Sequence, residues 1–186
     1  DHMNQEVLNK PIVMPAADND GSNITSTWQS YIPAFLAIFG SLALVLIRIN
    51  VGGERFISDG ALMMLALASY LIAAVFHLTN LYAPFRFAEK LGLFAATLGV
   101  FFNLSSWLVR WVAAYDRELA IFNTQGSNPA DMPWVFRYVP FANLYDLSLA
   151  FAFGAGITTL IVMRRKQFQI VAALSLPLAA IILVLA

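Results

Sequence analysis

Histidine residues are the first candidates for chemistry in this chain, because neutral imidazole is a common ligand of haem iron and of other metals. The sequence contains two, His2 and His77. His77 lies in an apolar stretch, where an ionisable side chain is costly and is often functional. Its imidazole suits an axial haem ligand or a proton relay. The imidazole also suits a hydrogen bond to a neighbouring helix or a lipid headgroup. The residues alone favour this second interpretation. His2 lies in a polar arm, and we predict no role for it.

Two tryptophans flank an arginine near the end of another apolar stretch, at Trp107, Arg110 and Trp111. Aromatic faces and a guanidinium at this spacing could hold a planar tetrapyrrole and one of its carboxylates. Membrane helices also end in such residues because these side chains anchor well in the headgroup layer, and this simpler interpretation is favoured. Arg137, which precedes a later apolar stretch, has the same two interpretations.

A group of polar residues introduces that later stretch. Pro140 ends the preceding backbone, and Asn143 and Asp146 have the spacing of a helix-capping pair. In one interpretation Asn143 caps the helix, Asp146 complements its positive end, and Tyr145 is an interface anchor. In the other, the phenol and the carboxylate face a cleft and orient a ligand or a partner. The sequence favours the first interpretation and leaves the second open.

Residues that are missing from the sequence exclude several classes of chemistry. The chain has no cysteine, which excludes disulfides, thiolate metal sites, a catalytic thiol and covalent haem attachment to this chain. Any haem must therefore be bound non-covalently. The paired carboxylates, nucleophile and base sets, and phosphate loops of soluble enzymes are not found, and no metal site is predicted. Whether the chain is part of an enzyme stays open.

Composition identifies the solvent of this protein as a bilayer. Of the 186 residues, 60% are hydrophobic and only 12% are charged, too few polar side chains to cover a soluble domain of this size. The formal net charge is zero and no long basic run occurs, so nucleic acid is not predicted as a partner.

Apolar stretches of about 20 residues are long enough to cross a hydrocarbon core of roughly 30 Å. We predict an all-α fold, a polytopic membrane bundle of about five transmembrane helices behind a polar N-terminal arm at 1–30. An outer loop is expected at 114–142, and Arg48 is expected to extend its guanidinium to the headgroups. The predicted spans are 31–49, 60–82, 91–113, 143–163 and 168–186. Four glycines inside these spans are expected to permit close helix packing: Gly92, Gly99, Gly154 and Gly156.

The orientation follows from the basic residues of the shortest connection. Arg164, Arg165 and Lys166 lie in a very short hairpin, where the positive-inside bias is most informative. This hairpin and the N-terminus are therefore predicted to be cytoplasmic or stromal. The loop at 114–142 and the C-terminus are predicted to lie on the outer side.

One motif resembles a known family. Residues 140–147, Pro-Phe-Ala-Asn-Leu-Tyr-Asp-Leu, are similar to the Pro-x-Ser-Asn-Leu-Tyr-Glu-Ser element of the CcsA/ResC membrane proteins of system II cytochrome c assembly. The helix at 91–111, the basic hairpin and the later helix with Pro177 follow that family's order over roughly half of the chain. The family-marked positions are Pro140, Asn143, Leu144, Tyr145 and Asp146.

The resemblance implies a membrane component that handles haem or delivers it to apocytochrome c on the outer face, with a ResB-like membrane partner. It implies a bacterial cytoplasmic membrane or a thylakoid membrane, and at most a part of a haem lyase. The family's tryptophan-rich haem segment, Trp-Gly-x-x-Trp-x-Trp-Asp, is not in this sequence, and His77 matches no family motif. The alternative is a non-catalytic accessory subunit, derived from the same family, of a larger respiratory or photosynthetic membrane complex.

Overall fold

The computed structural model describes residues 29–51, 56–126, 128–163 and 169–186. Within these ranges the chain is helical and has no strand, which confirms the all-α prediction. The α-helices are α2 (Ile32–Val51), α3 (Asp59–Tyr82), α4 (Arg86–Thr124), α5 (Leu144–Val162) and α6 (Gln169–Val184), and the two short 3-10 helices are η2 (Pro129–Asp131) and η3 (Val135–Tyr138).

Four of these helices, α2 to α5, are long and apolar enough to cross a membrane, and the chain is an integral membrane protein. The described part of α6 is shorter, at 16 residues. The predicted fifth span began at Phe168, and residues 164–168 lie outside the described part of the chain. The basic hairpin on which the orientation depends, and most of the N-terminal arm with His2, lie outside it as well.

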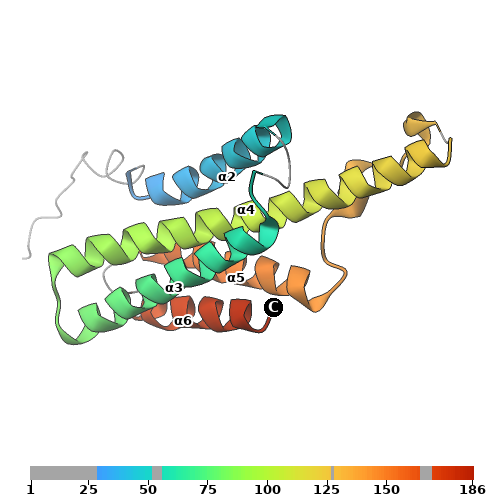
Figure 1. Ribbon diagram of the computed structural model, residues 1–186. Helices are drawn as coiled ribbons and strands as arrows, with labels where there is room; N and C mark the ends of the chain where they lie inside the picture. Colours follow the sequence, from blue (N-terminus) through green and yellow to red (C-terminus); the bar gives the residue numbers. More distant parts are fainter. Residues whose placement is uncertain (1–28, 52–55, 127, 164–168) are drawn as a thin grey trace, which may run out of the picture.

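Helix α4 is the centre of the bundle. It packs along α3, α2 and α5, and α6 lies against α3 and α5 (Figure 1). Beyond the other helices, α4 continues alone toward η2 and η3 (Figure 1). The helix therefore continues past the predicted span end at Ala113, and the first part of the expected loop at 114–142 is helical as far as Thr124. Asp116, Arg117 and Glu118 end the apolar run, but charged residues do not break a helix that leaves the bilayer.

Small residues form the interior of the bundle, and large apolar residues face outward. Alanines make up 13 of the 23 buried hydrophobic residues in the described part of the chain, for example Ala66, Ala96 and Ala152, while Leu36, Phe39 and Leu174 are exposed. This distribution is expected of membrane helices, because lipid solvates large apolar side chains and small residues let the backbones approach.

Tyr70 shows how close this approach is. A Cβ atom placed on Gly99 would lie 2.6 Å from Tyr70 Cδ1, and one on Gly156 would overlap the Tyr70 hydroxyl. These two glycines are therefore needed for close packing, as predicted. Gly154 has open space around it, so the same prediction is wrong there.

Candidate functional site

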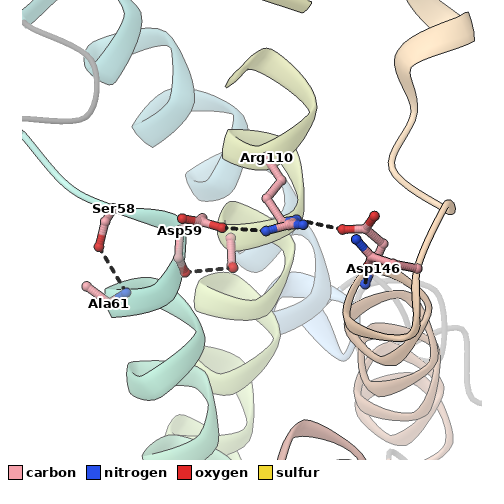
Figure 2. A network of polar contacts seen from close by, with 7 residues as sticks. Ser58, Asp59, Ala61, Arg110 and Asp146 are labelled. Carbon is pink, nitrogen blue, oxygen red and sulfur yellow. Dashed lines mark hydrogen bonds and ion pairs between the residues drawn. The ribbon is translucent and has the colours of Figure 1, made fainter. Parts of the chain in front are cut away.

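Arg110 of α4 joins three helices at one end of the bundle. Its Nη1 lies 3.0 Å from Asp59 Oδ2 at the start of α3, and its Nε lies 2.5 Å from Asp146 Oδ1 in the first turn of α5. Figure 2 shows the guanidinium between the two carboxylates. The Asp146 side chain is almost fully buried, whereas the side chains of Arg110 and Asp59 are each about one-third exposed. The pair with Asp146 is therefore the less screened of the two.

Local contacts fix the groups around Arg110. Ser106 Oγ donates a hydrogen bond to the Asp59 carbonyl oxygen at 2.8 Å, and the Tyr145 ring centroid lies 4.3 Å from the Arg110 guanidinium carbon. Asn143 Oδ1 accepts from the Asp146 backbone amide at 2.9 Å, so Asn143 caps α5 as predicted. Asp146 does more than complement the helix end, because its carboxylate holds Arg110. Leu144, by contrast, is exposed on the surface.

The two tryptophans attach residues 135–141, the segment that leads back from the end of α4 to α5, to α4 itself. Trp107 Nε1 donates to the Pro140 carbonyl oxygen and Trp111 Nε1 donates to the Val135 carbonyl oxygen, both at 3.0 Å. Their rings also lie against phenylalanines of that segment, Trp107 against Phe141 and Trp111 against Phe136. The indoles thus position residues 135–141, which form one wall of a cavity that Arg110 also lines. Neither sequence interpretation included this role.

A cavity of about 410 Å³ lies between this wall, the ends of α2, α3 and α5 that meet there, and residues 109–117 within α4. Four of the side chains around it are arginines and two are aspartates, a formal excess of two positive charges. These six residues are Arg48, Arg110, Arg117, Arg137, Asp59 and Asp146. Pro140 and Asn143 also line the cavity, so it brings together two of the predicted cationic residues with three of the family-marked positions.

Three of these arginines differ from Arg110 in their partners. Among the residues that the structure describes, Arg48, Arg117 and Arg137 have no carboxylate within 4.0 Å. Arg117 and Arg137 are exposed, but Arg48 is only 3% exposed, and its Nε donates to the Ile57 carbonyl oxygen at 3.0 Å. The expectation that Arg48 reaches the headgroups is therefore wrong, because its side chain turns into the bundle.

Tyr138, in the same wall, is a neutral hydrogen-bonding group. Partial burial raises the pKa of Tyr138 above its ordinary value, the carboxylate of Glu118 raises this pKa further, and Arg137 opposes the change. The phenol therefore keeps its proton at neutral pH and can donate it in a hydrogen bond.

His77 lies far from this cavity, toward the other end of α3, about 27 Å from Asp59 at 1.5 Å per residue. A Cβ atom on Gly92 would lie 2.9 Å from His77 Nε2, so the ring packs directly against the backbone of α4. His77 also borders a separate cavity of about 210 Å³ with Glu89 and Met163. The structure therefore does not bring His77 together with the predicted tryptophan and arginine residues.

Sequence reasoning missed Asp59, Arg48 and Arg117. A usable signal exists for Asp59, because α3 and α4 form an antiparallel hairpin through residues 83–85. Positions equally distant from that turn face each other, as Asp59 and Arg110 do, and likewise His77 and Gly92. The burial of Arg48 has no comparable signal.

No protein-family model, no curated protein and no solved structure matches this chain. The family resemblance of residues 140–147 therefore stays a prediction.

Proposed function

We propose that this chain is a membrane component of cytochrome c assembly that handles haem on the outer face of a bacterial cytoplasmic or thylakoid membrane. One observation carries the proposal. The family-like motif contributes Asp146 to the ion pair with Arg110, and the same motif lines a cavity with an excess of arginines. A motif that served only to cap and pack a helix would not require this excess.

The charge of the cavity suits the carboxylate edge of haem. A haem group carries two propionates, and the lining has a formal excess of two positive charges. Arginine recognises carboxylates through two parallel hydrogen bonds, which adds orientation to attraction. A volume of about 410 Å³ falls in the range of ligand cavities, roughly 300–1,000 Å³.

The cavity is poor in side chains that could ligate the iron. Its described lining contains no histidine or methionine, and Tyr138 is the only side chain there of a type that ligates haem iron. Because the Tyr138 phenol keeps its proton at neutral pH, the residues fit the propionate edge better than the metal. We therefore assign this chain the task of holding haem by its acidic edge, while a ResB-like partner or another part of the assembly provides the iron ligands for transfer to apocytochrome c.

The orientation proposed from the sequence places the cavity on the outer side, where exported cytochromes are found. The cavity is at the α4 end that leads into the 125–143 segment, opposite to the end at which α3 and α4 are joined. This orientation would make the cavity accessible to an apocytochrome without a further crossing of the membrane.

A second candidate function is that of a non-catalytic accessory subunit in a larger membrane complex. It is favoured by exposed aromatic residues outside the bundle, because Trp134 is 75% exposed and Phe136 and Phe141 are each more than half exposed. Aromatic side chains of this kind are typical of the core of a protein interface.

Haem titration of the purified protein in detergent micelles separates the two functions. The proposal expects a saturable shift of the haem absorption spectrum that Arg137→Gln weakens and His77→Ala leaves unchanged. Loss of the shift in His77→Ala would move the haem to the opposite end of the bundle. Absence of the shift in the wild-type protein would remove the haem function and leave the accessory subunit as the better conclusion.

A further inference from the structure

Arg48 is the least compensated charge in the described part of the bundle. Its side chain is 97% buried, yet its guanidinium has only the Ile57 carbonyl oxygen as a described hydrogen-bond partner. A buried charge is normally paired, because removal from water is costly and a carbonyl oxygen carries no net charge. Ionisable groups inside membrane proteins are retained where they serve a function.

Arg110 provides the comparison within the same cavity. It is more exposed than Arg48, yet it has a carboxylate on each side. Within the described residues, the arginine that links the helices is therefore neutralised by carboxylates, whereas Arg48, which lines the same cavity, has no carboxylate partner. Arg117 and Arg137 approach the same space from α4 and from η3, also without a described carboxylate partner.

We infer that Arg48, together with Arg117 and Arg137, forms a binding site for the anionic oxygens of a carboxylate or phosphate ligand. Where the ligand is haem, the inference rests on the proposed function and deepens it. The site would then recognise the acidic edge of the tetrapyrrole and would not require the iron. A phospholipid headgroup presents the same chemistry, and the experiments below distinguish the two sources.

The first experiment compares tetrapyrroles that differ only in the recognised groups. Iron-free protoporphyrin and its dimethyl ester are titrated into the protein in neutral detergent, with tryptophan fluorescence quenching as the readout. The free acid should bind, and the diester should bind at least about tenfold more weakly, as expected for the loss of one charge-assisted hydrogen-bond pair. Arg48→Met should weaken binding of the acid by a similar factor and leave the diester unaffected.

The second experiment measures the ligand-free protein. Arg48→Met removes a buried charge that has no carboxylate partner among the described residues, and it keeps most of the side-chain volume. The Tm of this variant in neutral detergent should therefore rise by about 2–4 °C. The matched control is Arg110→Met, which removes the partner of buried Asp146 and should lower the Tm. A fall in Tm for Arg48→Met would show that Arg48 has a stabilising partner outside the described residues, and would overturn the inference.

Failure of the inference and failure of the haem proposal give different results. If the acid and the diester bind equally well, the anion site is wrong although a tetrapyrrole site remains. If neither binds, the protein is compared in phosphatidylglycerol and phosphatidylcholine nanodiscs. A higher Tm in phosphatidylglycerol that disappears in Arg48→Met retains the anion site with a lipid ligand and removes the haem function. Equal Tm values in the two lipids, with no tetrapyrrole bound, overturn both.

Discussion

The two ends of the α3–α4 hairpin use polar residues in opposite ways. At one end, Arg110 is held by Asp59 and Asp146 beside a cavity with three further arginines. At the other, His77 packs its ring against Gly92, and its Nε2 has no described hydrogen-bond partner. The first end has the charges and the space to bind a ligand, whereas the imidazole at the second is held by close packing. The comparison indicates that the charged partners and the size of the neighbouring cavity, and not ionisable character alone, distinguish the two ends.

The largest effect on stability is expected from Arg110→Met, which breaks both ion pairs at the Arg110 end of the hairpin. The substitution leaves the Asp146 carboxylate buried without a cation, and such losses cost about 3–5 kcal/mol in a fully buried pair. Because Arg110 is 30% exposed, we expect a decrease of about 2–4 kcal/mol in the free energy of unfolding, measured by equilibrium unfolding in mixed micelles. The double substitution Arg110→Met with Asp146→Leu should recover most of the lost stability, because no buried carboxylate is left without a cation. A single variant as stable as the wild type would mean that the ion pair has no structural role.

A smaller effect on stability is expected from Gly92→Ala, at the end of the hairpin where His77 packs against Gly92. The added Cβ would lie 2.9 Å from His77 Nε2, and crowding of this kind costs about 1–3 kcal/mol. His77→Ala should relieve the crowding, so the double variant should be more stable than the sum of the two single effects predicts. The matched control is Gly154→Ala, where the added Cβ meets open space and should stabilise the helix slightly. Additive effects of Gly92→Ala and His77→Ala would contradict the packing role of His77.

The smallest effect on stability is expected from Asn143→Ala, which removes the side-chain cap of α5 beside the Arg110 ion pairs. Loss of the hydrogen bond from the Asp146 amide should cost about 1 kcal/mol. Asn143→Asp keeps a side-chain acceptor and should keep the stability of the cap. A stability change in both variants that equals that of Arg110→Met would instead indicate that Asn143 positions the carboxylate of Asp146, and it would make the cap part of the ion-pair network.

Much of the local structure can be predicted from the sequence. Apolar runs of sufficient length identify the helices, since a bilayer requires every backbone group to be satisfied within its own segment. Asn143 can be identified as a cap because its side chain acts on the amide three residues later. The end of α4 cannot be located in this way, because hydropathy shows where the bilayer ends and not where the helix ends.

The sequence by itself therefore determined that this chain is a bundle of apolar helices with a capped, polar corner near residue 143. Only the tertiary structure decided which charges meet there, because pairing depends on the rotation of each helix about its own axis. Asp59 faces Arg110 across the hairpin and Asp146 reaches it from a third helix, whereas Arg48 turns inward without a described carboxylate. Hydrophobicity places a residue at a depth in the membrane, and helix packing chooses its neighbours at that depth.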